Sequence, residues 1–442
     1  MDADEYLEDD GPDPKVAAVL AELSAKDANV AEAAEAAFEW VLAGDGPESL
    51  TQERIQLFCW YQLPYKWGDE LAGKFEVLAS LARALELLQL PRYAAICLSD
   101  ETRTILEAFE ASYKKGMAAF KKADLSSGLR PPDLEDFAWG DYCGIVESDA
   151  QSEVSNFLEL AISSGDLVPG SKGFKAAQQS LTRSFLTAPR DGSSLLERIR
   201  AERIEAWITD RRSNIRRELF AAIEPEIRAP KVLPEGSDPL PRMRWLLEQI
   251  KDGQALTKTG NLNRAFVQRA APAYDWDLSH LPQSEDEITE LWVTREFMAR
   301  RKLTRRSGSK LLASSKGKCL LADPEAFWNE VCRGLLDIEP FPAAAGEVLL
   351  AAMAGGEQNY QRFCSKVSAA ILQEGFHDAK GDPPVRDQIV TAMHETLNLI
   401  RSLGLYEESG DWRDRRYEFT DVGRATAIQA LWSRATGPRF TL

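Results

Sequence analysis

The sequence predicts a mainly α-helical protein, and three observations lead to this class. Apolar residues recur at the three- and four-residue spacing of helices along most of the chain. After residue 241 the order helix, helix, helix, hairpin occurs twice. The chain has 442 residues, of which 44% are apolar and 28% are charged. It is therefore long enough for about two to four domains and too apolar to be wholly disordered.

Changes in composition divide the chain into six predicted segments. Seven acids precede the first base, Lys15, which predicts a self-repelling, disordered tail with no secretory leader. Four prolines between residues 229 and 241 predict a linker. The segments are the acidic tail 1–14, a helical domain 15–130, a second helical block 131–228, the Pro-rich linker 229–241, and two units at 242–338 and 339–442.

The region before the linker predicts a series of amphipathic helices. Thr51 or Ser49 can cap one of them, and Pro64 is expected to end it. The last of them alternates arginines with acids at i, i+4 spacing, which predicts a salt-bridged, solvated helix; a phosphate-binding stripe is the alternative. The predicted helices are 16–23, 30–42, one carrying Ile55 to Trp60, 69–90, 99–122, 149–163, 174–187 and 195–223.

The region after the linker predicts two units of the same order, each with three helices and a hairpin. This is the order of a winged helix-turn-helix unit, so the sequence predicts a multi-helical N-terminal region followed by two winged helix-turn-helix units with short β-hairpins. Asn261 and Ser284 are the predicted helix caps in the first unit. Its elements are helices 243–250, about 261–270 and 285–302, with strands 302–306 and 310–313. Those of the second unit are helices 343–353, 357–373 and 385–403, strands 405–407 and 416–419, and a closing helix to about 433.

Residues 241–438 also carry short motifs that resemble a family of uncharacterised bacterial proteins. The motifs are the extended segment 256–262, the strand-turn-strand at 303–313, Ala322-Asp323-Pro324 and the segment 419–423. The resemblance implies a pair of winged helices and a general association with DNA-linked or regulatory roles. It implies no activity, because that family offers no catalytic motif to transfer.

The sequence contains no recognisable catalytic or metal-binding pattern. The six cysteines lie far apart with no C-x-x-C pair, and no two of the three histidines stand at i, i+4. Gly165 and Gly170 have the glycine spacing of a phosphate loop, but Ser171 stands where its lysine is required. We therefore expect a cytoplasmic protein that is not an enzyme, with reduced thiols, no cofactor, no metal and no membrane span. An enzyme with dispersed carboxylates is the weakest alternative.

One segment differs in charge from the rest of the chain, whose formal net charge is −17. Residues 295–318 contain nine bases and one acid, Glu296, so the formal charge of this segment is +8. Arginine and lysine on a hairpin are suited to pair with DNA phosphates. The alternatives are a solvated hairpin with cations at a helix C-terminus, or binding to an acidic protein partner or to the chain's own acidic tail. The candidate residues are Arg300, Arg301, Lys302, Arg305, Arg306, Lys310 and Lys316.

The second unit offers residue types that read bases or phosphates. By contrast, the third helix of the first unit begins with Glu285-Asp286-Glu287, which phosphates would repel. Trp412, in the second hairpin, fits either a functional or a packing role. The candidate residues here are Arg386, Gln388, Asn398, Arg401, Arg413, Arg415 and Arg416.

These patterns lead to one functional hypothesis and one alternative. The hypothesis is a regulatory protein that contacts the phosphate backbone of double-stranded DNA through its hairpins, with the helical N-terminal region available for partner proteins. The alternative is a protein–protein interaction subunit of a larger assembly, since winged helices also bind proteins and the chain is strongly acidic.

Overall fold

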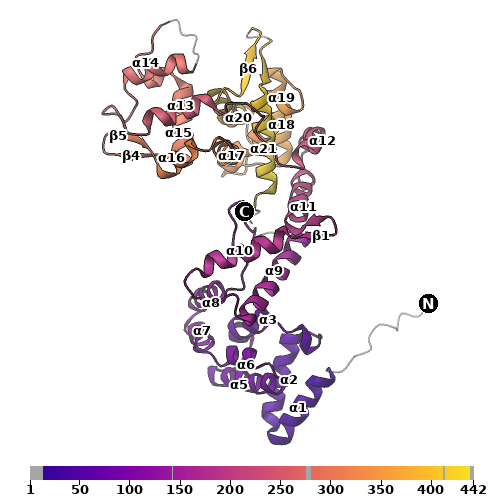
Figure 1. The fold of residues 1–442 in the computed structure, drawn as a ribbon. Helices are drawn as coiled ribbons and strands as arrows, with labels where there is room; N and C mark the ends of the chain where they lie inside the picture. The colour runs from indigo at the N-terminus through magenta and orange to yellow at the C-terminus, as the bar shows by residue number, and fades with distance from the viewer. Residues whose placement is uncertain (1–12, 142, 275–279, 412–413, 439–442) are drawn as a thin grey trace, which may run out of the picture. The chain divides into compact units, whose positions relative to one another are not determined.

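Helices account for most of the residues in the computed structural model, which describes residues 13–141, 143–274, 280–411 and 414–438 (Figure 1). The mainly α-helical class is thereby confirmed. The described chain divides into two compact units, one reaching Arg198 and the other spanning Ile199–Pro438. The predicted block 131–228 is shared between the two units, and the Pro-rich segment 229–241 belongs to the second. Residues 1–12 of the predicted tail lie outside the described residues.

The first unit packs its helices around a core that contains Leu78, Leu81 and Leu85, three residues of the predicted apolar stripe. A π-helical turn, Phe58–Gln62, joins α3 to α4. Its elements are α1 (Pro14–Lys26), α2 (Ala28–Leu42), a 3-10 turn (Pro47–Ser49), α3 (Gln52–Leu57), α4 (Leu63–Lys66), α5 (Leu71–Leu87), α6 (Pro91–Cys97), α7 (Asp100–Ala111), α8 (Tyr113–Ser127), α9 (Ile145–Ser164), α10 (Phe174–Thr187), β1 (Pro189–Arg190), β2 (Ser193–Ser194) and the start of α11 (Leu195–Thr209).

Three boundaries differ from the prediction for local reasons. Ser112 divides the predicted helix 99–122: its backbone is extended, its N–H donates to Ala108 and its hydroxyl accepts from the Lys115 N–H. Pro64 does not end the helical run, since proline fits the first turn of α4. The predicted helix 195–223 is interrupted after Thr209, and Ser213 caps the helix that follows.

The second compact unit contains the described residues of both segments, 242–338 and 339–442, for which the sequence predicted three helices and a hairpin. These segments are called the first and the second repeat from here on. It continues from α11 into α12 (Asn214–Ile227), and the first repeat then runs through α13 (Pro241–Ile250), β3 (Gln254–Ala255), α14 (Arg264–Ala273), a 3-10 turn (Glu285–Glu287), α15 (Thr289–Arg300), β4 (Thr304–Ser307) and β5 (Lys310–Ala313). Two helices that the sequence did not predict follow, α16 (Ser315–Leu321) and α17 (Pro324–Gly334). Asn263, not the predicted Asn261, caps α14.

The three strands of the first repeat form an antiparallel sheet in the order β3-β5-β4. The second repeat has α18 (Pro340–Ala354), α19 (Tyr360–Glu374), α20 (Arg386–Ser402), β6 (Tyr406–Ser409), β7 (Arg416–Phe419) and α21 (Asp421–Thr436). A single bridge from Asn359 to Arg416 takes the place that β3 has in the first repeat. Both repeats therefore follow the order helix, strand pairing, helix, helix, hairpin.

The two repeats share one hydrophobic core rather than folding around separate ones. The helices α15 and α20 pack against each other, as do α17 and α21 (Figure 1). The fully buried Trp328 of α17 donates its indole N–H to Thr426 of α21 at 2.8 Å. Core formation in one repeat therefore depends on the presence of the other.

Gly423, in the first turn of α21, provides the first testable prediction. A Cβ at this position would overlap the Leu405 carbonyl oxygen, which also accepts from the Thr420 N–H. Helix propensity alone would make alanine more stable by about 1 kcal/mol. The close approach reverses the sign, so we expect Gly423→Ala to lower the free energy of unfolding by about 1–3 kcal/mol.

Chemical denaturation of the full chain measures this effect. Gly68→Ala is the control, because a Cβ at Gly68 meets nothing within 4 Å. A Gly423→Ala variant as stable as the wild type would contradict the close approach between α21 and Leu405.

Candidate nucleic-acid interface

The hairpin of β4 and β5 carries three exposed bases, two on β4 and one on β5. Leu311 and Ala313 are buried, whereas Arg305, Arg306 and Lys310 are exposed. Arg306 lies directly opposite Leu311 in the register, so these two side chains stand on the same face of the hairpin, and Arg305, one residue earlier, stands on the other face. The bases of β4 are exposed because this strand is open to solvent from Arg305 to Ser307.

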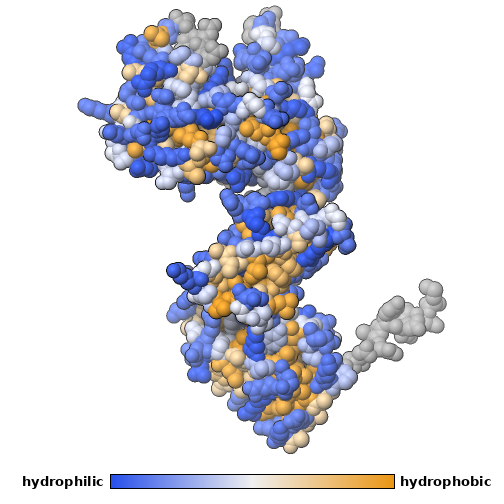
Figure 2. All heavy atoms as spheres, viewed as in Figure 1, coloured by the Kyte–Doolittle hydropathy of each residue, from blue (hydrophilic) through white to orange (hydrophobic). Residues whose placement is uncertain are grey.

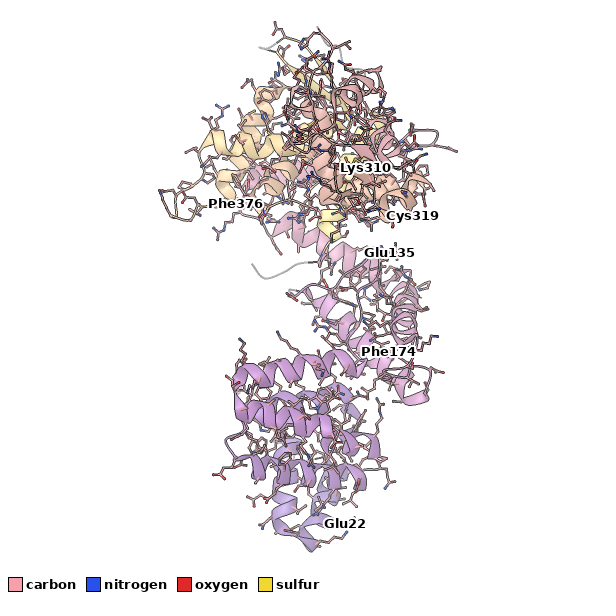
Figure 3. All side chains as sticks on the ribbon, turned by 90° about the vertical axis from the view of Figure 1, so that its left-hand side faces the viewer. Glu22, Glu135, Phe174, Lys310, Cys319 and Phe376 are labelled. Atoms are coloured by element: carbon pink, nitrogen blue, oxygen red, sulfur yellow. The ribbon has the colours of Figure 1, made fainter. Side chains whose placement is uncertain are left out.

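Two glycines allow neighbouring backbone to approach the side chains of these bases. Arg306 donates from Nε to the Gly308 carbonyl at 3.1 Å, and its guanidinium lies beside Gly260. The aliphatic stem of Lys310, labelled in Figure 3, lies beside Gly253 at the edge of β3. Neither Arg305 nor Lys310 forms an ion pair with a described residue.

Three of the nine bases counted in the sequence are instead committed to ion pairs within the protein. Arg295, whose side chain is 12% exposed, pairs with Glu285 at 2.7 Å. Arg301 pairs with Glu330 at 2.8 Å and also with Asp337. Lys316 pairs with the same Glu330 at 2.7 Å. These bases contribute less positive potential to the surface than the sequence count implies.

Glu330 is the acid that holds two of these bases. Burial alone would raise its pKa, but the hydrogen bonds and charges of Lys316 and Arg301 outweigh burial and hold the pKa below the usual value. Glu330 therefore stays ionised at neutral pH and neutralises part of the base-rich segment.

The remaining bases of this segment are exposed. Lys302 follows α15 in a left-handed backbone conformation, and Lys318 lies on α16 next to Cys319, which Figure 3 labels. Arg300 lies over the Phe297 ring at 5.7 Å and shares a shallow hollow with Asp337, Glu339 and Glu395. Acids thus surround Arg300, whereas Lys302, Arg305, Arg306, Lys310 and Lys318 form no ion pair within the described part of the chain.

The acids at the start of the third helix have structural partners. Glu285, 1% exposed, accepts from the Leu262 N–H at 2.7 Å and from Arg295. Burial raises the pKa of Glu285, although Leu262 and Arg295 oppose that effect. Asp286 accepts from the Asn261 side chain at 3.1 Å. The acidic turn therefore joins the segment around Leu262 to α15, and it still places negative charge where a recognition helix would meet DNA.

The described arginine candidates in and next to the second hairpin form ion pairs within the protein. Arg401 lies 3.5 Å from Glu290 of α15 and 3.7 Å from Glu408 of β6. Arg415 pairs with Glu408 at 3.1 Å, and Arg416 pairs with Asp414 at 3.5 Å. Trp412 and Arg413, also singled out in the sequence, lie outside the described residues. The second hairpin is thus a weaker source of positive potential than the first.

The candidate residues of α20 differ in their surroundings and do not form one surface for phosphate. Gln388 accepts from the Val385 N–H at 2.9 Å and so caps its own helix. Arg386 is exposed and Asn398 is half-buried. His394 forms a 2.8 Å hydrogen bond with the Tyr360 hydroxyl, and burial lowers its pKa. Asp387 and Glu395 line the same shallow hollow as Gln388, which reduces the attraction of this face for phosphate.

The packing of α15 against α20 is antiparallel. Glu290 near the start of α15 pairs with Arg401 near the end of α20, while Arg300 at the end of α15 shares a hollow with Glu395 in the middle of α20. Part of the surface of α15 is thus covered by α20, and part of the surface of α20 is covered by α15. Hydrophilic residues dominate the face of the second unit drawn in Figure 2.

Within the described residues there is no group of three or more His, Cys, Asp or Glu side chains arranged to hold a metal ion. No helix in the described ranges combines the length and apolar character that a bilayer crossing requires.

Comparison with known proteins confirms the partial resemblance to an uncharacterised bacterial family. Residues 237–326 match the model of a family described as the Y4jL N-terminal domain. A curated relative, the uncharacterized protein y4jL of Sinorhizobium fredii (strain NBRC 101917 / NGR234), is 29% identical over 96 residues. The match covers 20% of this chain and 44% of the relative, so it spans less than half of that protein. No solved structure matches the chain. The matched region contains the first repeat and its hairpin.

Proposed function

We propose that the two repeats are winged helices and that the first binds the phosphate backbone of double-stranded DNA through its β4–β5 hairpin. The strand order β3-β5-β4, in which a strand placed between the first two helices joins the hairpin, supports the winged-helix assignment. The observation that carries DNA binding is the set of exposed bases without a described acidic partner, on a chain with a net charge of −17. Such a set attracts phosphates locally although the whole protein is anionic.

Backbone contact is favoured over base reading for two reasons. The start of α15 carries Glu285, Asp286 and Glu287, which oppose its entry into the major groove. In addition, α15 and α20 pack against each other. The protein is therefore proposed as a DNA-associated regulatory factor with weak sequence preference, acting in the cytoplasm and catalysing no reaction.

A salt titration with a duplex of about 20 base pairs tests this function. At ~50 mM salt, where phosphate contacts are strong, the full chain should bind the duplex. The logarithm of the association constant should fall with log[salt] with a slope of about −2.7 if three bases engage phosphates, and about −4.5 if five do. Absence of binding at this salt concentration would overturn the proposal.

A protein-interaction subunit is the second candidate. The packing of α15 on α20 favours it, because helices that would otherwise enter a DNA groove are partly covered. Exposed apolar side chains on the first unit, among them Ile145 at 79% and Leu160 at 69%, also suit a partner protein. This candidate predicts no duplex retardation at ~50 mM salt, together with a partner that co-purifies in stoichiometric amount.

A further inference from the structure

A cavity of about 270 Å³ in the first unit has no part in the proposed DNA contact. It lies between α3 with the following π-helical turn, α8, the loop after α8, and α9. Polar and aromatic residues line it together, including Glu53, Gln56, Trp60, Phe120 and Asp124. Its volume is close to the lower end of small-molecule sites, which typically run from about 300 to 1,000 Å³.

Gln56 is a buried polar side chain in the wall of this cavity. It is 7% exposed, and its amide forms no hydrogen bond with any described residue. Its amide atoms are not among the described buried polar atoms that lack a partner, so solvent in the cavity reaches them. The free amide therefore faces a space that a hydrogen-bonding ligand can fill.

Glu53 is the second group in the cavity wall without a partner. Glu53 is an exposed residue that lines the cavity, and its carboxylate forms no ion pair with a described residue. Partial desolvation by the cavity wall, followed by the charges of Asp124 and Glu159, raises its pKa. Those neighbours already have partners of their own. Asp124 pairs with Arg130 at 3.6 Å, and Glu159 accepts from the Tyr93 hydroxyl at 2.6 Å and from the Gln52 N–H at 2.8 Å.

Arg130 also lines the cavity but is paired with Asp124, so the Glu53 carboxylate has no described cation of its own, and a bound cation would balance its charge. Two aromatic side chains in the same wall favour this occupant. Trp60 is held in place by its indole N–H, which donates to Thr102 at 2.8 Å, and Phe120 lies on α8. Aromatic faces attract ammonium groups, most strongly where water is excluded.

We propose that this cavity binds a small aliphatic amine that carries a second polar group. The Glu53 carboxylate is the counter-ion of the ammonium group, Trp60 and Phe120 form the walls, and the Gln56 amide binds the second polar group. The site lies wholly in the first unit and is independent of the hairpin, so DNA binding and amine binding can fail separately.

Isothermal titration of the full chain with 1,4-diaminobutane tests the proposal, with 1,4-butanediol as the neutral probe of equal length. We expect saturable binding of the diamine and none of the diol. Glu53→Gln retains the shape of the side chain and removes its charge, and it should weaken diamine binding at least about tenfold. Gln56→Leu should also weaken it.

Glu76→Gln is the matched control, since Glu76 is exposed on α5 and does not line the cavity. Its diamine affinity should equal that of the wild type. Thermal unfolding of each variant verifies that the first unit remains folded. Absence of saturable diamine binding, equal affinity in the Glu53→Gln variant, or equal binding of the diol would each overturn the proposal.

Discussion

Replacing Glu347 by alanine should lower the free energy of unfolding of the second unit by about 3–5 kcal/mol. Glu347 of α18 is 2% exposed and pairs with Arg216 at 3.1 Å and Arg434 at 3.0 Å. Arg216, 3% exposed, lies with its guanidinium against the rings of Trp207 and Phe220, at 4.6 and 4.2 Å from their centres. Removal of the carboxylate would leave the guanidinium of Arg216 buried without its counter-ion, which costs far more than the loss of a surface pair.

Urea titration followed by hydrogen exchange in α18 measures this effect, because a chain of two units need not unfold in one transition. Glu347→Gln retains most of the side-chain volume and separates the loss of charge from the loss of packing. Glu418→Ala is the control, since Glu418 is exposed on β7 of the same unit, and we expect a change within about 0.5 kcal/mol. If the Glu347→Ala protein were as stable as the wild type, the ion pairs of Glu347 with Arg216 and Arg434 would contribute nothing to the free energy of unfolding.

The Glu347 carboxylate also makes the stability of the second unit depend on pH. Burial alone would raise the pKa of Glu347, but Arg216, Arg434 and Arg211 outweigh burial and hold it below the usual value. The unfolded chain therefore takes up the proton at a higher pH than the folded one does. The stabilisation from this group is complete above the unfolded pKa of about 4.3 and is lost as the pH falls through the lowered folded pKa. The stability difference between wild type and Glu347→Ala should accordingly shrink in acid.

The second large effect concerns DNA. Changing Arg305, Arg306 and Lys310 together to alanine should make the salt slope less negative by about 2.7 and weaken duplex binding on the order of 10³-fold at ~50 mM salt. These three bases are exposed and form no ion pair with the described residues, so their charge is available to phosphates. All three residues are exposed, so the variant should fold as the wild type does.

A matched variant isolates the contribution of position from that of net charge. Changing Arg401, Arg415 and Arg416 to alanine removes the same three charges, but these bases already face Glu290, Glu408 and Asp414. We expect its salt slope to change by less than about 1. Equal losses in the two triple variants would show that only net charge matters, and unchanged binding in the first would remove the hairpin from the interface.

The sequence predicted the helices well where their ends carry local signals. The predicted helix 69–90 corresponds to α5, and the predicted closing helix to about 433 corresponds to α21, which Thr420 caps. Gly308 and its polar neighbours placed the strands of the first hairpin to within two residues. The breaks at Ser112 and after Thr209 were missed, because helical periodicity continues across both of them.

The sequence could not show which bases of the first hairpin region remain free. Arg301 and Lys316 looked equivalent to Arg305 and Lys310 in the charge count, yet both are held by Glu330, which lies 29 residues after Arg301 and outside the counted segment.

By itself, the sequence determined the helical class, the repeated order of elements and the excess of bases at one hairpin. Each of these depends on residues close together in the chain, through periodicity, capping and turn formation. Only the tertiary structure decided which charges are neutralised and which polar groups share a cavity. Arg216 meets Glu347 across 131 residues, and Glu53 faces Asp124 from another helix. Coulomb attraction and burial act through space, so partners distant in the chain leave no local pattern in the sequence.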